Sequence, residues 1–450
     1  MMGGESSALS EVVARIRGAG GRVWLVGGAL RDELLGRSVG EKDLATDLVP
    51  DRVLALFPGS LDVGARFGTV IVRLGGETFE VTTLRGEGAY SDGRRPDEVR
   101  FGLDINEDLA RRDFTVNALA RELPDGGLVD PFGGFSDLNK GILHAVGNPD
   151  ERLAEDGLRA YRACRFAATL EFEVAPNLLR AVRRNAAVAR GVAWERIGDE
   201  LAKAMTAPRP GVTFELLRET GLLDHCLPEL AACWGVTQNR YHELDVFDHS
   251  LRSCDLVPAE KPAVRWAALL HDLAKPETKQ LKDRDFVFYG HDDRSAELAD
   301  RAMRRLTLPR ELRERACLLI KNHMLHYSPE WTDAAVRRFV RRVGPGNVAD
   351  LFDLVIADRQ AHRRTEAFQL PADISELMER IDELGAAGAP LTVADLAVSG
   401  DNLLELTGRE PGRWVGELLD RLVEEVLEHP DLNEREALLA RAREILADDR

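Results

Sequence analysis

The sequence has 450 residues, 44% of them hydrophobic and 30% charged, a balance typical of a globular protein with about three domains. The formal net charge of −17 argues against a general nucleic-acid binder, because affinity for phosphate groups comes from Lys and Arg, although local arginine clusters could still form an RNA-binding stripe. No apolar run reaches the ~20 residues that span a bilayer. Five dispersed cysteines indicate thiols rather than disulfides, so we expect a cytoplasmic protein without a membrane partner.

The first chemical signal lies between residues 22 and 47. An amphipathic helix is predicted at residues 8–17, followed by an apolar strand at residues 23–26, a glycine turn, a short helix and a second strand. This segment carries six candidate site residues: Gly27, Gly28, Arg31, Asp32, Glu41 and Asp43.

The segment suits a triphosphate held with a divalent cation. Two glycines let the backbone approach a ligand, and the helix that they open directs N–H groups and its positive dipole end outward. Glu41 and Asp43 are two apart on a strand, so their carboxylates point to one face, where they would hold Mg²⁺ against the phosphates. The alternative is an ordinary turn followed by two solvated acids.

The next segments predict further sheet structure. Residues 51–57 favour a short helix, and residues 69–74 and 78–84 favour two strands joined by a Gly-Gly turn. Glu80 is a polar residue among apolar ones, and two interpretations stay open: a third carboxylate of the metal site, or a charge on an edge strand. Residues 85–100 form a polar, glycine-rich loop, and long loops inside compact domains are usually functional or mobile.

Two arginine-containing segments follow. Residues 109–120 predict a helix whose start carries Arg111, Arg112 and Asp113, which on their own fit a plain surface ion pair. A second helix is predicted to begin near residue 149, and its spacing places four residues on one face: Asp156, Arg159, Arg162 and Arg165.

An aspartate beside an arginine can select a nucleobase. Cytosine and adenine each present an amino donor beside a ring-nitrogen acceptor, whereas guanine and uracil present the reverse order. Asp156 and Arg159 would therefore accept CTP and ATP and reject GTP and UTP. The alternative is an intrahelical salt bridge worth only ~0.3 to 0.5 kcal/mol.

Taken together, these motifs resemble the head and neck of class II tRNA nucleotidyltransferases and poly(A) polymerases, members of the polymerase-β-like superfamily. The matching strings are the Gly-Gly segment, RRDFTVNALA and EDGLR. Three positions depart from the family pattern, which usually has Asp at Glu41, Pro at Gly157 and Arg at His144. The resemblance implies that the loop at residues 85–100 switches specificity during addition, and relatives that add only two cytidines lack this loop.

The resemblance also implies individual roles. Gly28 and Arg31 would hold the triphosphate, Arg112 the ribose and phosphates, and Asp156 with Arg159 the base. Arg162 and Arg165 would steady the phosphate or the base from the same helix face.

Seven of the ten histidines lie between residues 242 and 362. Imidazole with carboxylate suits a transition metal that activates water. The ordered set resembles the HD domain of metal-dependent phosphohydrolases, which implies four core ligands and two further ligands: His249, His271, Asp272 and Asp358, with His291 and His323. The alternatives are histidines with a structural role and a degenerate scaffold without turnover.

The expected fold is α+β: a nucleotidyltransferase head with a mixed sheet, followed by an elongated all-α neck and body, an HD domain and a helical tail. The predicted domains are residues 1–145, 146–235, 236–365 and 366–450. The tail resembles family helices that contact the tRNA elbow.

The expected function is template-independent addition of CCA, or of its terminal A, to tRNA from CTP and ATP. Mg²⁺ is expected in the head, and a second divalent metal in the HD domain. Three rivals stay open: an HD phosphohydrolase whose head is weakened by Glu41, a poly(A) polymerase, and a binding protein with both sites silent.

Overall fold

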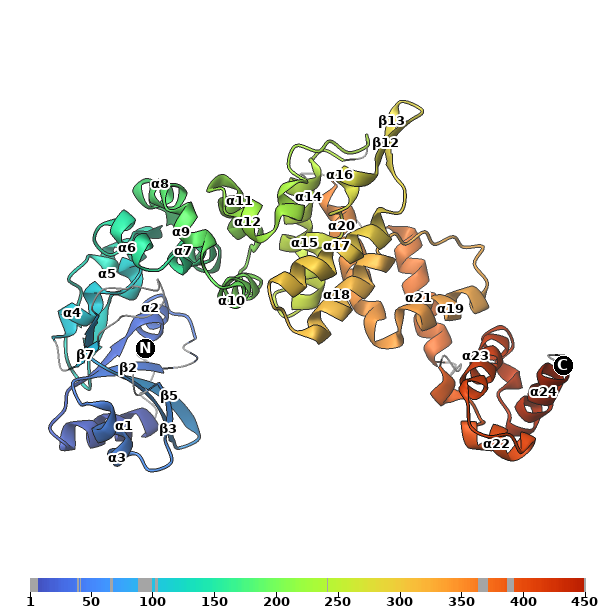
Figure 1. Cartoon of the computed structure of the whole chain (residues 1–450), viewed down its shortest axis with the longest axis horizontal. Coiled ribbons are helices and arrows are strands. Elements are labelled where there is room, and N and C mark those ends of the chain that lie inside the picture. Colours follow the sequence, from blue (N-terminus) through green and yellow to red (C-terminus); the bar gives the residue numbers. More distant parts are fainter. Residues whose placement is uncertain are drawn as a thin grey trace. The chain divides into compact units, whose positions relative to one another are not determined.

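The computed structural model describes residues 7–38, 40, 42–64, 68–87, 99–101, 104–240, 242–362, 371–386 and 392–448. It divides into two compact units: residues 1–231 with 305–308, and residues 232–304 with 309–450. A mixed sheet lies in the first unit, and helices make up most of the rest of the chain (Figure 1). This arrangement confirms the predicted α+β fold class. The finer domain boundaries stay predictions.

The head of the first unit is built on a seven-stranded sheet in the order β3-β4-β5-β2-β1-β8-β9. Only the β2–β5 pair is parallel within this sheet, and the other neighbours are antiparallel. The strands are β1 Val23–Val26, β2 Lys42–Thr46, β3 Leu61–Gly64, β4 Thr69–Leu74, β5 Glu77–Thr83, β8 Ala120–Glu122 and β9 Leu128–Val129. The predicted strands at 23–26, 69–74 and 78–84 are confirmed.

Five α-helices lie in the described residues of this part of the chain. They are α1 Ser7–Gly18, α2 Gly27–Leu34, α3 Pro50–Leu56, α4 Ile105–Ala110 and α5 Gly134–Lys140. Trp24 and Val26 of β1 are buried on one face of the sheet, where they pack in a cluster that includes Leu109 of α4. The loop predicted at residues 85–100 is wrong at its two ends, where strands β6 Arg85–Glu87 and β7 Val99–Phe101 pair with each other; its residues 88–98 lie outside the described ranges.

The predicted helix at residues 109–120 is wrong. Helix α4 ends at Ala110, residues 115–117 form a 3₁₀ turn, and the chain then enters β8. Phe114 has an extended backbone, and its N–H donates to the Asp113 side chain at 2.8 Å. This local hydrogen bond replaces a helical one, because aspartate side chains compete with the helix for backbone N–H groups. Arg111, Arg112 and Asp113 therefore lie on a bend after a helix.

The helical part of the first unit follows. Its elements are α6 Pro149–Glu155, α7 Leu158–Leu170, α8 Pro176–Arg184, α9 Ala186–Arg190, α10 Trp194–Ala204, α11 Gly211–Glu219, α12 Leu223–Cys226 and α13 Pro228–Ala231, with the short strands β10 Ile142–Leu143 and β11 Glu173–Val174. The predicted start near residue 149 and the helical run at 170–230 are confirmed.

The single helix face predicted for Asp156 and Arg159 is wrong. The chain breaks between α6 and α7 at Asp156, whose backbone is extended. The Asp156 side chain accepts the N–H of Leu158 at 3.0 Å, and this bond satisfies a donor at the start of α7. A Cβ at Gly157 would lie 2.6 Å from the carbonyl oxygen of Val188 in α9. Only glycine therefore fits where the start of α7 meets α9.

In its described residues, the second unit is helical apart from one hairpin. Its elements are α14 Val246–Leu256, α15 Pro262–Leu270, α16 Lys275–Thr278, β12 Lys279–Lys282, β13 Asp285–Phe288, α17 His291–Arg305, α18 Arg310–Asn322, α19 Asp333–Val343, α20 Val348–Ala361, α21 Ala372–Ala386, α22 Gly400–Thr407, α23 Arg413–Glu428 and α24 Arg435–Asp448. The predicted helical character beyond residue 366 is confirmed for the described residues. Of the helices in the described ranges, none is long and apolar enough to cross a membrane.

Candidate active site and candidate metal centre

Strand β1 runs directly into the glycine turn that was predicted to hold phosphates. Gly27 has a φ of +63°, a left-handed conformation that glycine adopts without strain. A Cβ at this position would lie 2.7 Å from Nη1 of Arg112, so the turn and this guanidinium are in close contact. Within the described residues, no side chain caps the N-terminus of α2. The Gly27 N–H donates to the Leu119 carbonyl oxygen at 3.4 Å, so an anion would be received by the N–H groups that follow in the first turn.

Two carboxylates stand opposite each other beside this turn. Asp43 of β2 and Glu80 of β5 are register partners in the parallel strand pair, and both line one cavity of about 630 Å³ with Gly27 and Gly28. Neighbouring oxygen ligands of this kind suit a hard divalent cation. Glu41, the other predicted ligand, lies outside the described residues.

Eight arginines and four acidic residues line the described part of this cavity. The acids are Asp43, Glu80, Asp113 and Asp156, and the arginines are Arg31, Arg85, Arg111, Arg112, Arg159, Arg162, Arg165 and Arg196. The excess of positive charge suits a triphosphate, because clustered guanidinium groups bind phosphate oxygens in a bidentate manner.

A buried relay connects α7 to α2 through Asp113. The Asp113 carboxylate accepts hydrogen bonds from Nε of Arg162 at 2.7 Å and from Nδ2 of Asn117 at 3.0 Å. Asn117 in turn accepts from Nη1 of Arg31 at 2.7 Å. Burial raises the pKa of Asp113, but Arg162, Asn117 and the Phe114 N–H outweigh this effect and lower it to about 2. Asp113 is therefore ionised at neutral pH, and its negative charge positions Arg162 directly and Arg31 through Asn117.

The neighbouring arginine pair has its own buried anchor. Asp108 of α4 is 1% exposed and receives Nη2 of Arg111 at 2.7 Å and Nη2 of Arg112 at 3.2 Å. Desolvation raises the pKa of Asp108, and the two guanidinium groups reverse this and hold it below its ordinary value. The sequence interpretation missed Asp108, although an acid three and four residues before two arginines is a recognisable helix signal.

The predicted base-reading pair has other partners. Asp156 pairs with Nη2 of Arg196 on α10 at 2.7 Å, whereas Nη1 of Arg159 lies 2.5 Å from Glu155. Nη2 of Arg159 also donates to the Arg111 carbonyl at 3.0 Å. Both predicted residues face the cavity, and Arg196 is a lining residue that the sequence interpretation missed.

The remaining predicted arginines surround one buried ring. The guanidinium carbons of Arg31, Arg162 and Arg165 lie 5.3, 5.2 and 4.0 Å from the ring centre of Phe166. Glu200 of α10 is 3% exposed and accepts from Nε of Arg165 at 2.5 Å. The ring and this buried acid hold the cations toward the cavity.

Asp32 does not line this cavity. Its carboxylate accepts two hydrogen bonds from Arg31, each at 2.9 Å, and it lines an adjacent cavity of about 540 Å³. Asp32 therefore orients Arg31 through these two hydrogen bonds.

The second unit brings together all six residues predicted for the histidine site. Nε2 of His249 lies 3.3 Å from Nε2 of His271 and 2.9 Å from Asp358. Nε2 of His291 lies 3.3 Å from Nε2 of His323. The ligand atoms of His249, His271 and Asp272, and those of Asp272, His291 and His323, form two groups within 4.8 Å.

The hydrogen bonds of these histidines indicate a metal centre. His271, His291 and His323 each have Nδ1 within 2.6 to 2.8 Å of the carbonyl oxygen three residues earlier. If Nδ1 donates, each of these Nε2 atoms carries a lone pair, and the lone pairs of His291 and His323, whose Nε2 atoms are 3.3 Å apart, require a shared proton or a cation between them. The donor set of imidazole and carboxylate fits a divalent transition metal.

Asp272 joins the two halves of this centre. Its Oδ2 lies 3.2 Å from Nε2 of His271, and its Oδ1 lies 3.4 Å from Nε2 of His291. Lys275 approaches the same carboxylate at 2.6 Å. Full burial raises the pKa of Asp272, yet His271 and Lys275 outweigh it and hold the pKa well below its ordinary range. Asp272 would therefore serve as a ligand shared by the group with His271 and the group with His291.

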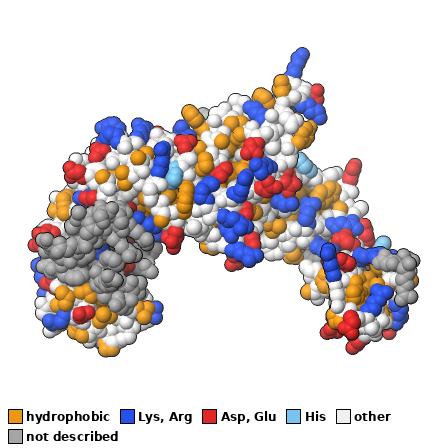
Figure 2. All heavy atoms as spheres, in the orientation of Figure 1, with side chains coloured by type: hydrophobic (Ala, Val, Ile, Leu, Met, Phe, Trp, Pro, Cys, Tyr) orange, Lys and Arg blue, Asp and Glu red, His pale blue; other side chains and the backbone are white. Residues whose placement is uncertain are grey.

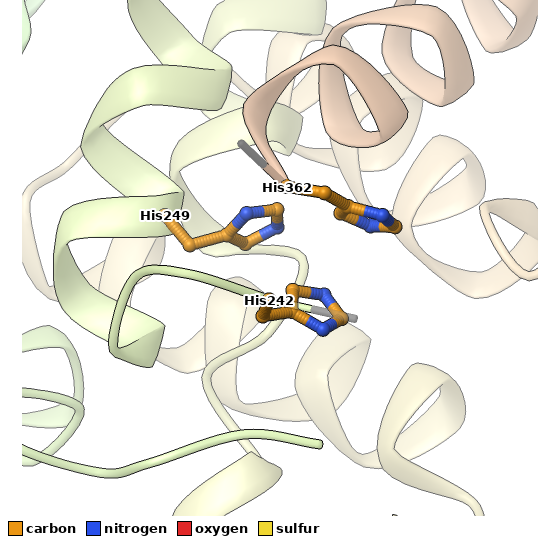
Figure 3. A group of neighbouring side chains, drawn as sticks. All are labelled: His242, His249 and His362. Atoms are coloured by element: carbon orange, nitrogen blue, oxygen red, sulfur yellow. The ribbon is translucent and has the colours of Figure 1, made fainter. Parts of the chain in front are cut away.

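Two further histidines extend the centre on the Asp358 side. Figure 3 shows the rings of His242, His249 and His362 close together, although they come from three segments of the chain. The ring centres of His242 and His362 are 4.1 Å apart, and Nε2 of His362 lies 3.5 Å from Asp358. The sequence interpretation gave His242 and His362 no role, because neither belongs to the HD pattern.

Three segments of the chain match known families. Residues 23–144 match the poly A polymerase head domain, residues 171–233 the probable RNA and SrmB-binding site of polymerase A, and residues 293–442 tRNA nucleotidyltransferase domain 2.

Similar proteins span almost the whole chain. It is 38% identical over 419 residues to the A-adding tRNA nucleotidyltransferase of Deinococcus radiodurans, covering 89% of this chain and 90% of that protein. It is 32% identical over 435 residues to the CCA-adding enzyme of Geobacillus thermodenitrificans, covering 95% and 94%. The crystal structure of the Bacillus stearothermophilus CCA-adding enzyme in complex with CTP gives a TM-score of 0.73 at 28% identity and covers 98% of both chains.

The mixed sheet, the glycine turn, the paired carboxylates and the arginine-lined cavity define a nucleotidyltransferase of the divalent-metal-dependent class. The chain belongs to the family of tRNA nucleotidyltransferases and poly(A) polymerases, as its sequence resemblance implied. The HD assignment of the histidine centre stays a prediction.

Proposed function

We propose that this chain adds CCA, or its terminal A, to the 3′ ends of tRNA from CTP and ATP and releases pyrophosphate. The observation that carries the proposal is the single cavity in which the glycine turn, the Asp43–Glu80 pair and eight arginines meet. Relatives named as A-adding and CCA-adding enzymes, and a solved relative in complex with CTP, support the same substrates. A cytoplasmic location belongs to this proposal.

Asp43 and Glu80, with Glu41 added from outside the described residues, would hold Mg²⁺. When bound, Mg²⁺ activates the RNA 3′-hydroxyl and balances charge on the leaving pyrophosphate. The N-terminus of α2 and Arg31 bind the triphosphate, and Gly27 permits the close backbone approach. In the reaction, the 3′-oxygen forms a bond to the α-phosphorus and the bond to pyrophosphate breaks.

The base lies, in this proposal, near Asp156 and Arg159. Because Arg196 holds Asp156 and Glu155 holds Arg159, both groups are oriented by other side chains rather than by each other. A fixed carboxylate acceptor and a fixed guanidinium donor match the amino group and ring nitrogen of cytosine and adenine. Arg111 and Arg112, anchored by Asp108, are placed for the ribose and phosphates.

Pyrophosphate release tests this assignment. With an acceptor tRNA and Mg²⁺, we expect release from CTP or ATP and none above background from GTP or UTP. Asp43→Ala abolishes the signal, whereas Asp51→Ala, an exposed acid at the start of α3, leaves it intact. Equal release from all four nucleotides would contradict the base-reading assignment, and release that survives Asp43→Ala would contradict the metal assignment.

The histidine centre supports a second candidate activity, a metal-dependent phosphohydrolase. The observation in its favour is the pairing of Nε2 atoms at 3.3 Å around the buried Asp272. We expect divalent metal in the purified chain and hydrolysis of bis(p-nitrophenyl) phosphate, both lost in His271→Ala and both retained in His429→Ala, an exposed histidine of the tail. Metal content that is equal in the two variants would contradict a metal centre at this site.

A further inference from the structure

The hairpin β12–β13 forms one wall of the histidine site. Phe286, Val287, Phe288 and Tyr289 line a cavity of about 730 Å³ that also contains Asp272, His291 and His323 among its lining residues. The ring centre of Phe288 lies 6.4 Å from that of His291. Aromatic side chains therefore stand directly beside the candidate metal ligands, and the candidate phosphohydrolase activity does not require them.

Each aromatic side chain of this wall has a lysine against it. Nζ of Lys279 lies 3.9 Å from the ring centre of Phe286, and Nζ of Lys275 lies 5.3 Å from that of Phe288. On the outer side, Nζ of Lys282 lies 3.1 Å from the hydroxyl of Tyr289. Rings that stack on bases, next to ammonium groups that contact phosphates, are the usual components of single-strand nucleic-acid sites.

This surface continues beyond the cavity. Tyr289 is 61% exposed although it lines the cavity, and Lys282 is exposed next to it. In the second unit the hairpin projects from the helices, and basic, acidic and hydrophobic side chains share its outer surface (Figures 1 and 2). A single phosphate or a lone nucleotide would need only the inner part, whereas a strand of several nucleotides would also use the exposed part.

We propose that the hairpin binds the single-stranded end of an RNA and directs its terminal phosphate to the histidine centre. The inference rests on the proposed phosphohydrolase function and names its substrate class. Bases stack on Phe286, Phe288 and Tyr289, and Lys282 contacts the phosphates. In the hydrolysis of a 3′-phosphate, the water oxygen forms a bond to phosphorus, the bond to the ribose oxygen breaks, and that oxygen takes the proton that water loses.

Two readouts on the full chain test this proposal. The first compares hydrolysis of a short 3′-phosphorylated RNA with hydrolysis of p-nitrophenyl phosphate, a phosphate monoester of one small ring. The second uses the same RNA with 4-thiouridine at its end, and maps photo-crosslinks by mass spectrometry. The test variant is Lys282→Ala with Tyr289→Ala, both exposed, and the matched control is Lys321→Ala, an exposed lysine of α18.

We expect the double variant to raise KM for the RNA about ten-fold, the loss of about one stacked base, and to change KM for p-nitrophenyl phosphate less, whereas Lys321→Ala leaves both KM values unchanged. Crosslinks are expected on residues 286–289 and are expected to be lost in the variant. Unchanged KM with crosslinks elsewhere would overturn the hairpin assignment and leave the phosphohydrolase standing. If neither substrate is hydrolysed, the phosphohydrolase fails, and the crosslink position alone supports or overturns strand binding by the hairpin.

Discussion

Asp113→Asn is the most informative substitution in the nucleotide site, because one buried carboxylate holds the framework of arginines. The side chain is 8% exposed and accepts bonds from Arg162, Asn117 and the N–H of Phe114. The difference between a pKa of about 2 and the ordinary 3.8 corresponds to about 2 kcal/mol of stabilisation. Removing one partner of a buried ion pair costs about 3 to 5 kcal/mol. We therefore expect the free energy of unfolding to fall by about 2 to 4 kcal/mol.

The pH dependence has a defined sign. Because the folded pKa of Asp113 is depressed, its stabilisation is complete above the unfolded value of 3.8 and is lost as the pH falls toward about 2. The difference in free energy of unfolding between the original chain and Asp113→Asn should be constant from pH 5 to 7 and should shrink below about pH 4.

Urea unfolding and nucleotide addition measure the two consequences. Asp150→Asn is the matched control, because Asp150 also accepts from an arginine, Arg184 at 2.6 Å, but on the surface. We expect this control to leave the unfolding midpoint unchanged. Asp113→Asn should also raise KM for ATP, since Arg31 and Arg162 lose their common support. Equal effects of the two variants on stability would refute the relay through Asp113.

Three further outcomes follow from the sites. Gly27→Ala should abolish nucleotide addition without unfolding the chain, because the new Cβ would meet Nη1 of Arg112 at 2.7 Å; extension assays and circular dichroism check this. Arg196→Ala should reduce the preference for ATP over GTP about ten-fold, since Asp156 loses its partner; unchanged selectivity in pyrophosphate release would contradict the role. Chelation should lower the unfolding midpoint of the chain, and His291→Ala should remove that response, as differential scanning calorimetry would show.

The parts of the nucleotide site that the sequence predicted are local. The apolar run before Gly27 and the spacing to Asp43 lie within one short segment, and strand and turn preferences act over that range. The structure places these residues and Glu80 in one cavity. The six histidine-site residues were identified in another way, through the resemblance of their order along the chain to the HD domain.

The parts that the sequence could not predict depend on distant partners. Arg196 meets Asp156 across forty positions of sequence, and no local pattern connects the two. The helix prediction at 109–120 failed because the Asp113 carboxylate accepts the Phe114 N–H. Phe114 also forms an antiparallel β-bridge with Ala145. Tertiary contacts override helical periodicity at such points.

The most direct test of the central claim is extension of three tRNA transcripts, which end before CCA, after C and after CC. Each is incubated with labelled CTP or ATP and Mg²⁺, with the original chain and with Asp43→Ala. We predict incorporation on all three, or of AMP on the CC-ended transcript, and its loss in the variant. The first pattern defines a CCA-adding enzyme and the second an A-adding one. No incorporation on any transcript would contradict the proposed function.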